Sequence, residues 1–269
     1  MTTPTLISPI SPELIAFDFD GVICDGLIEY FQTAWQAYCK LFKPNSEHPP
    51  EGLAERFYPL RPVIETGWEM PVLVAALMQG IDDPELDQKI IEQWPGMALP
   101  YLDEANLTKK QSVQTLDGVR DQRIKTDLDG WLSLHRFYPG VIDRLGALLA
   151  REVPVYIVST KEGRFIEALL GQSGVSFPSD RILGKEVKRP KYETLRLLKE
   201  KHSAANIWFI EDRLPALNAV TQQDDLKQVQ LFLADWGYNL APDRDAARQS
   251  SRIHLLSLEK VVQEFDKWL

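Results

Sequence analysis

The most constraining feature of the sequence is a run of four apolar residues, 14–17, that leads directly into Asp18, Phe19, Asp20 and Gly21. A short, continuous apolar run is typical of a buried strand in a parallel sheet. The carboxyl ends of such strands are where open α/β sheets bind their ligands. Burying two carboxylates there costs free energy unless a cation or hydrogen-bond donors compensate for their charge. The stretch therefore predicts a strand that delivers acids to a ligand site, against the simpler interpretation of a solvated Asp-Gly turn.

Outside residues 26–136, the sequence alternates short apolar runs with stretches of helical periodicity. Strands that alternate with helices form parallel sheets covered by helices, because each parallel connection needs a crossover. The pattern therefore predicts the α/β class with a Rossmann-like, doubly wound parallel sheet. After the strand at 14–17, the predicted strands are 153–158, 182–184, 207–210, 229–234 and 253–256, and the last predicted helix is 258–269.

Residues 26–136 show a different pattern, in which apolar side chains have helical spacing and no run indicates a strand. We therefore predict two domains: an α/β core made of 1–25 and 137–269, and an all-helical cap domain, 26–136, inserted after the first strand. The stretch 57–69 is irregular and mixed in chemistry, so no regular element is predicted there. The predicted helices of the insertion are 27–42, 70–78, 84–94 and 106–134, the last being one helix or a pair.

The composition limits the partners of the chain. Its 269 residues carry a formal net charge of −9 and contain no block rich in lysine and arginine, so binding to nucleic acid or to an anionic membrane is not expected. No apolar run is long enough to span a bilayer, and residues 1–12 lack the features of a signal peptide. Cys24 and Cys39 form neither a disulfide framework nor a zinc-ligand pattern. These features predict a cytoplasmic protein and predict nothing about its oligomeric state.

Polar side chains follow three of the predicted strands at the point where each strand ends. Asp18 and Asp20 follow the first, Ser159 follows the second, and Glu211 with Asp212 follows the strand at 207–210. Because parallel strands place these ends at one edge, the side chains are expected to meet there. Carboxylate oxygens with a substrate phosphate suit Mg²⁺, and a carboxylate in such a site can act as a nucleophile.

This order of groups resembles the haloacid dehalogenase-like (HAD) hydrolase superfamily. The resemblance covers roughly residues 10–25 and 137–240, and the stretch 137–141 is similar to the return from a cap into the core. Each motif alone is weak, whereas four in the right order at the right strand ends are specific. The resemblance implies a phosphatase-type enzyme whose helical insertion is a type 1 cap. The motifs are Asp18-Phe19-Asp20-Gly21-Val22, the strand end at Ser159, Lys188-Arg189-Pro190-Lys191, and Glu211-Asp212.

The resemblance also implies catalytic roles. Asp18 would attack phosphorus, and Asp20 would protonate the leaving oxygen and later activate water. Ser159 and Thr160 would bind the phosphoryl oxygens. An aspartate at position 20 favours phosphate chemistry, because dehalogenases of the superfamily lack that acid.

The implied cofactor is Mg²⁺, held by Asp18, the backbone carbonyl of Asp20, and Asp212, with Glu211 as a second acid beside the metal. The further acid that members often carry about four residues later is Ala216 in this sequence.

Two lysines are candidates for the phosphate-site cation. Lys191 begins a predicted helix and is favoured, while Lys188 stands nearer the more familiar Lys-Pro form of the motif. Lys161 and Arg164 follow Ser159 and could contact a phosphate, but the favoured interpretation is the first turn of a solvated helix. Arg61 lies in the irregular part of the insertion, where contacts that select the substrate could lie.

Taken together, the sequence predicts a Mg²⁺-dependent phosphohydrolase that cleaves a small phosphorylated metabolite through an aspartyl-phosphate. A phosphomutase, which returns the phosphoryl group to a sugar, is an alternative that the core motifs do not separate from it. A non-catalytic phosphate-binding or regulatory protein is a second alternative, which the complete set of acids disfavours. The segment 235–238 also ends a strand near the predicted site, and a plain exit from the strand explains it equally well.

Overall fold

The computed structural model describes residues 11–151 and 153–269. The prediction that residues 1–12 are not a signal peptide concerns mostly residues 1–10, which lie outside the described part. The chain divides into two compact units, one made of the described residues up to Asp25 together with Phe137–Leu269, and one made of Gly26–Arg136. None of the helices in the described residues is both long and apolar enough to cross a membrane.

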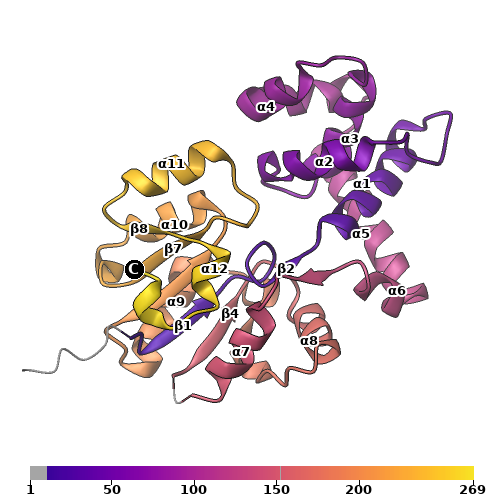
Figure 1. Cartoon of the computed structure of the whole chain (residues 1–269). Helices are drawn as coiled ribbons and strands as arrows, with labels where there is room; N and C mark the ends of the chain where they lie inside the picture. The colour runs from indigo at the N-terminus through magenta and orange to yellow at the C-terminus, as the bar shows by residue number, and fades with distance from the viewer. Residues whose placement is uncertain (1–10, 152) are drawn as a thin grey trace, which may run out of the picture. The chain divides into compact units, whose positions relative to one another are not determined.

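A six-stranded parallel sheet forms the centre of the first unit, with the strand order β5-β4-β1-β6-β7-β8 (Figure 1). The first strand of the chain is thus central, and β4 and β6 pair with it on either side. Its four residues are completely buried, as expected for an apolar strand covered on both faces. The predicted α/β class with a parallel sheet is confirmed. The strands are β1 (Leu14–Phe17), β4 (Val155–Val158), β5 (Ile182–Leu183), β6 (Ile207–Glu211), β7 (Gln230–Ala234) and β8 (Ile253–Leu256).

Helices pack on one face of this sheet through a continuous apolar core. Side chains that alternate along the strands, such as Leu14, Phe209 and Leu231, meet buried leucines and valines of the covering helices there. Pro215 and Pro242 stand in the first turn of two of these helices, where a missing backbone N–H is tolerated. The helices of this face are α9 (Lys191–His202), α10 (Leu214–Thr221) and α11 (Ala241–Gln249).

The opposite face is covered by aromatic side chains from the end of the chain. Trp268 lies against Phe17, Trp208 and Phe232 of three strands, and its ring centroid is 5.5 Å from that of Trp208. The helix predicted at 258–269 is wrong in its extent, because the α-helix ends at Val261 and a separate 3₁₀ turn follows, with Phe265 and Trp268 buried. The remaining helices of this unit are α7 (Val141–Leu149), α8 (Gly163–Gln172) and α12 (Leu258–Val261), with short 3₁₀ turns η2 (Ser179–Arg181), η3 (Lys185–Val187), η4 (Asp224–Leu226) and η5 (Phe265–Lys267).

The second unit is built of helices, with α1 packed against α3 and α5. Thr108 and Gln111 form a reciprocal capping box at the start of α5, which explains where that helix begins. Where the chain leaves the first unit and returns to it, the short strands β2 (Cys24–Asp25) and β3 (Arg136–Phe137) pair in a separate two-stranded sheet. The helices are α1 (Leu27–Phe42), α2 (Leu53–Leu60), η1 (Arg61–Val63), α3 (Glu69–Gln79), α4 (Leu86–Glu104), α5 (Lys109–Thr126) and α6 (Leu128–Leu132).

Two predictions within this unit are wrong. The irregular stretch 57–69 contains the end of α2 and the 3₁₀ turn η1, because Leu53, Phe57 and Leu60 are buried on one face despite Pro59. The helix predicted at 84–94 begins at Leu86 and continues to Glu104 through two prolines. Packing of one face offsets the backbone hydrogen bonds that proline removes. The residues buried on that face are Leu86, Ile90, Trp94, Ala98 and Leu102.

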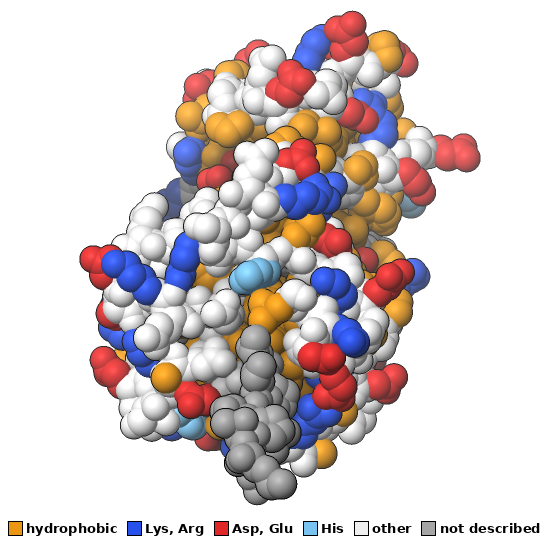
Figure 2. Space-filling view, turned by 60° about the vertical axis from the view of Figure 1, so that its left-hand side comes forward, with side chains coloured by type: hydrophobic (Ala, Val, Ile, Leu, Met, Phe, Trp, Pro, Cys, Tyr) orange, Lys and Arg blue, Asp and Glu red, His pale blue; other side chains and the backbone are white. Residues whose placement is uncertain are grey.

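Charged side chains of both signs are interspersed on the face shown in Figure 2. The pattern there agrees with the mixed charges along the sequence.

Candidate functional site

Asp18 is the first residue after β1 and lies at the carboxyl edge of the sheet. Its backbone N–H donates to the carbonyl of Ile210 at 2.8 Å, which continues the pairing of β1 with β6. The residue is 6% exposed, and its Oδ1 accepts a hydrogen bond from the backbone N–H of Phe19 at 2.7 Å. Gly21 then turns the chain with a φ of +82°, a conformation that favours glycine. The strand and the turn together fix the carboxylate of Asp18.

Lys191 bridges two acids of this edge. As the first residue of α9, it places its Nζ 2.8 Å from Oδ2 of Asp18 and 2.6 Å from Oε2 of Glu211. Lys188, the other candidate, is an exposed residue with a φ of 49° at the end of η3. Both lysines line a cavity of about 180 Å³ together with Ser159 and Thr160. Of the two, Lys191 is the lysine that the fold holds against Asp18.

Asp18, Glu211 and Asp212 form a cluster in which one oxygen from each side chain lies within 4.8 Å of the others. Glu211 is the last residue of β6 and Asp212 follows it, so adjacent strands supply the three acids. Both acids from β6 are at most 1% exposed. Three buried carboxylates at this spacing require compensating positive charge.

Burial disfavours the ionised forms of all three acids. It raises the pKa of Asp18 to about 7, with Glu211 adding to the rise and Lys191 opposing it. It raises the pKa of Glu211 to about 6 against the effect of Lys191, and the pKa of Asp212 to about 6 with a contribution from Asp18. Burial also works against the charge of Lys191, but Asp18 and Glu211 outweigh it and raise the pKa of that ammonium. Three acids therefore share one bridging lysine, which favours a bound cation.

The hydrogen bonds made by the oxygen atoms of the cluster indicate which of these atoms is available to a divalent cation. Oδ2 of Asp212 accepts a hydrogen bond from the backbone N–H of Tyr238 at 2.7 Å, whereas Oδ1 is buried and has no hydrogen-bond partner among the described residues. Both oxygens of Glu211 are used, one by Lys191 and the other by the backbone N–H of Arg213 at 2.9 Å. A buried oxygen without a donor needs an explanation, and a metal ion supplies one. The oxygen-only set is compatible with a hard divalent cation, and Oδ1 of Asp212 is the oxygen of the cluster best placed to ligate it.

The carboxylate of Asp20 contacts Lys161, a residue that the sequence pattern placed in a solvated helix turn. The Nζ of Lys161 lies 3.1 Å from Oδ1 and 3.4 Å from Oδ2 of Asp20, and its side chain is only 9% exposed. The backbone N–H of Lys161 donates to Oγ of Ser159 at 3.2 Å, so this residue links the two motifs. The interpretation of Lys161 as a solvated helix turn is wrong, because the chain turns inward before α8 begins at Gly163. The sequence feature that indicates a site role for Lys161 is its position two residues after Ser159, the serine that follows β4.

The other predicted site residues divide between the two units. Ser159 is 6% exposed, and its backbone N–H donates to the carbonyl of Leu183 at 3.1 Å, which fixes it at the end of β4; Thr160 beside it is exposed. Arg61 lies in the inserted unit, where its Nη1 donates to the carbonyl of Ile64 and its guanidinium lies 4.8 Å from the ring centroid of Tyr30.

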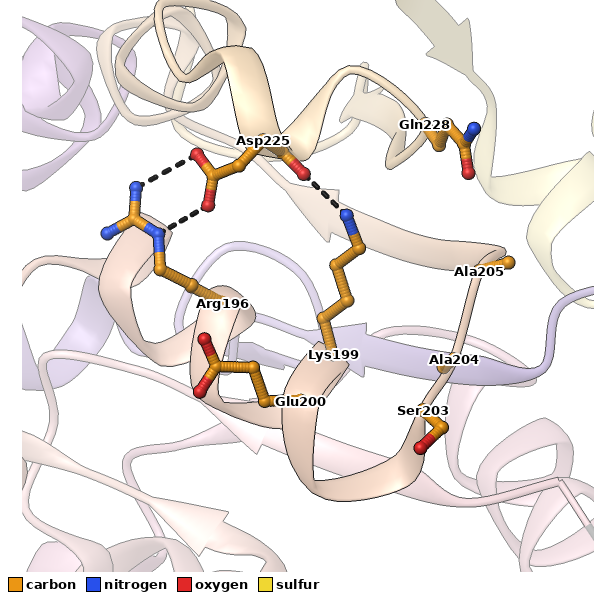
Figure 3. A pocket seen from close by; sticks show the side chains of 8 residues that line it. All are labelled: Arg196, Lys199, Glu200, Ser203, Ala204, Ala205, Asp225 and Gln228. Atoms are coloured by element: carbon orange, nitrogen blue, oxygen red, sulfur yellow. Dashed lines mark hydrogen bonds and ion pairs between the residues drawn. The ribbon is translucent and has the colours of Figure 1, made fainter.

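A larger pocket of about 450 Å³ lies beside α9 (Figure 3). Its lining includes residues 203–205, which precede β6, and Asp225 with Gln228, which precede β7. The pocket therefore lies at the amino ends of these strands. Two of its cations are already engaged, since Arg196 pairs with the carboxylate of Asp225 and Lys199 donates to the carbonyl of Asp225. Ligands of open α/β sheets bind at the carboxyl ends, so the acid cluster is the better candidate site.

The chain matches the sequence model of a known protein family. A sequence model of the haloacid dehalogenase-like hydrolases matches residues 12–218, which run from β1 into α10. The curated proteins contain no match to this chain.

Several solved structures share the fold. One from Clostridium acetobutylicum, described as a predicted phosphatase, has a TM-score of 0.58 and 14% identity over 93% of this chain and 96% of that chain. One from Haemophilus somnus 129PT, described as a predicted phosphoglycolate phosphatase, has a TM-score of 0.52 and 17% identity over 84% and 87% of the two chains. A haloacid dehalogenase-like family protein from Streptococcus pneumoniae has a TM-score of 0.53 and 15% identity over 91% and 94%. At such low identity, the similarity shows the fold alone.

Proposed function

This chain belongs to the haloacid dehalogenase-like hydrolases, and on that premise we propose that it is a Mg²⁺-dependent phosphatase of a small phosphorylated metabolite. The observation that carries the proposal is the buried cluster of Asp18, Glu211 and Asp212 with Lys191 bonded to two of its acids. A module that only bound phosphate would gain nothing from three buried acids, because they repel an anion. The cluster suits a reaction in which a carboxylate attacks phosphorus.

The first half of the reaction transfers the phosphoryl group to the protein. A carboxylate oxygen of Asp18 attacks phosphorus, and the bond from phosphorus to the ester oxygen breaks. Asp20 gives its proton to that oxygen, so that the product leaves as an alcohol. The ammonium of Lys191 and the hydroxyl of Ser159 offset the charge that develops on the phosphoryl oxygens.

The second half returns the protein to its starting state. A water molecule attacks the phosphorus of the aspartyl-phosphate, and Asp20, now a carboxylate, accepts the proton of that water. The bond between phosphorus and the Asp18 oxygen breaks, which restores the carboxylate and releases inorganic phosphate. One carboxyl group thus serves as acid and then as base.

Asp18 and Asp212 would hold Mg²⁺, with Oδ1 of Asp212 as the oxygen that lacks a donor. When bound, the ion would offset the negative charge of the substrate phosphate and of the buried acids. Glu211 accepts a hydrogen bond from Nζ of Lys191 and so helps to hold that ammonium beside Asp18.

The proposal is tested with a panel of phosphorylated metabolites, including sugar phosphates and 2-phosphoglycolate, with and without Mg²⁺. Release of inorganic phosphate from at least one small monoester, and only with the metal, is the expected result. The proposal would be contradicted if no member of the panel released phosphate, or if a sugar phosphate were isomerised without net release of phosphate.

Lys161→Met is expected to slow the hydrolysis of an alkyl phosphate more than that of p-nitrophenyl phosphate. An alkoxide needs the proton of Asp20 in order to leave, whereas p-nitrophenolate leaves without one, and Lys161 holds the carboxylate of Asp20. Since general acid catalysis contributes roughly 10²- to 10⁴-fold, we expect kcat for the alkyl ester to fall by about 10-fold or more. Lys227→Met, at an exposed lysine of the same unit, is the matched control. Equal losses on both esters would contradict this role of Lys161.

We also propose that the inserted unit selects the substrate, because the core residues handle the phosphoryl group and cannot recognise the rest of a metabolite. Arg61→Ala is expected to change the ranking of substrates by kcat/KM while the Mg²⁺ requirement stays the same. Arg56→Ala, at an arginine of α2 that pairs with Asp87 in the same unit, is the control. An unchanged ranking with Arg61→Ala on the full panel would contradict the proposal for this residue.

A further inference from the structure

Residues 236–239, the turn between β7 and α11, hold Asp212 through several contacts. The backbone N–H of Tyr238 donates to Oδ2 of Asp212 at 2.7 Å. The side-chain amide of Asn239, which is 6% exposed, donates to the carbonyl of Asp212 at 3.0 Å and to that of Ala234 at 2.7 Å. Asn239 thus ties the residue after β6 to the end of β7, and Tyr238 fixes the rotation of the carboxylate. These are hydrogen bonds to both the main chain and the side chain of one acid.

The backbone at Gly237 in this turn and at Gly21 lies very close to Asp212. A Cβ atom added at Gly237 would lie 2.2 Å from Cβ of Asp212 and 2.4 Å from the carbonyl oxygen of Gly21. A Cβ atom at Gly21 would lie 2.1 Å from Oδ2 of Asp212. The backbone therefore approaches Asp212 closely from two sides, which only glycine permits at these positions.

The turn also holds the loop that follows β1. The indole N–H of Trp236 donates to the carbonyl of Val22 at 3.1 Å, and the hydroxyl of Tyr238 donates to Oδ1 of Asp25 at 2.9 Å. Segments that follow β1, β6 and β7 are thereby joined at the carboxyl edge of the sheet. The turn therefore contacts both Asp212 and the loop after Asp20.

We propose that residues 236–239 are a positioning element for the divalent cation, in which Asn239 and Gly237 hold Asp212 so that its Oδ1 remains available as a ligand. The inference rests on the metal-dependent function proposed above. Because Tyr238 occupies Oδ2, the oxygen left without a donor is the one that a cation can take. Partners that orient a metal ligand typically change metal affinity by about 10- to 100-fold when they are removed.

The test measures binding of Mg²⁺ alone, or of Mn²⁺ as its probe, to the full chain by calorimetry, with no substrate present. Asn239→Ala is expected to raise the Kd for the metal by about 10-fold or more. Asn218→Ala, at an exposed asparagine of α10, is the matched control and should leave the Kd unchanged. Tyr238→Phe keeps the backbone N–H and is expected to bind the metal as the wild type does.

A glycine pair supplies a second arm in case Asn239→Ala does not fold by circular dichroism. Gly237→Ala should weaken metal binding, because its methyl group displaces Asp212, whereas Gly171→Ala meets no atom within 4 Å and should not. Wild-type affinity in Asn239→Ala or Gly237→Ala would overturn the inference and leave the proposed function intact. Equal weakening in Tyr238→Phe would also overturn it, since the loss would then come from general packing. If the wild type itself binds neither metal, the metal-dependent function fails together with the inference.

Discussion

Asp18→Asn is expected to abolish turnover and to leave the fold intact. The amide cannot attack phosphorus, and loss of a covalent nucleophile lowers kcat by roughly 10⁴-fold or more. The side chain keeps its shape between Phe19 and Lys191, so far-ultraviolet circular dichroism should be unchanged. Asp143→Asn, at an exposed acid of α7, is the control and should retain activity. Substantial phosphatase activity in Asp18→Asn would show that another group is the nucleophile.

The same variant is expected to melt at the wild-type temperature or above it at pH 8 in EDTA. Burial raises the pKa of Asp18 to about 7, above the value of about 3.9 for an unfolded aspartate. An acid whose pKa is raised on folding stabilises the fold while it is protonated, and this contribution is lost as the pH rises from about 4 to above 7. At pH 8 the wild type therefore has a buried carboxylate whose ionisation opposes folding, and the variant does not. A melting temperature of Asp18→Asn clearly below that of the wild type would contradict the inference that the ionised carboxylate of Asp18 opposes folding.

Asp212→Asn is expected to raise the Mg²⁺ concentration for half-maximal activity by about 100-fold or more, since the loss of a ligand exceeds the loss of a residue that orients one. EDTA should silence the wild type. Glu211→Gln should leave the Mg²⁺ requirement close to that of the wild type, because both oxygens of Glu211 already bond to Lys191 and Arg213. Titration of phosphate release against Mg²⁺ checks both variants. Full activity of the wild type in excess EDTA would exclude this metal site, and equal shifts in the two variants would make Glu211 a ligand.

The sequence is most informative where local chemistry and the fold agree. The continuous apolar run at 14–17 predicted a strand buried on both faces with Asp18 at its carboxyl end, and the structure shows this strand at the centre of the sheet. Asp18, Glu211 and Asp212 come together because β1 and β6 are neighbours, and parallel strands end at the same edge. The prediction of a parallel sheet was enough to bring these acids to one edge, whereas the pairing of β1 with β6 was known only from the structure.

Features that depend on distant contacts could not be predicted from local pattern. Proline at 95 and 100 indicates the end of a helix, yet α4 continues because apolar residues four apart bury one face. Lys161 is separated from Asp20 by 141 residues, and only the fold shows that the two form an ion pair. The turn at 236–239 likewise has a local explanation as a strand exit, and its bond to Asp212 depends on the packing of β6 beside β7.

The most direct test of the account is detection of a phosphoryl group on Asp18. Asp20→Asn should accept the phosphoryl group from p-nitrophenyl phosphate, whose leaving group needs no proton, and should hydrolyse the aspartyl-phosphate slowly because it lacks the base. After an acid quench, mass spectrometry of the peptide that contains Asp18 should show one added phosphoryl group, with a burst of p-nitrophenolate equal to the enzyme concentration. The double variant Asp18→Asn with Asp20→Asn should show neither. Phosphate release without a phosphorylated intermediate, or a phosphoryl group on a different residue, would contradict the central claim.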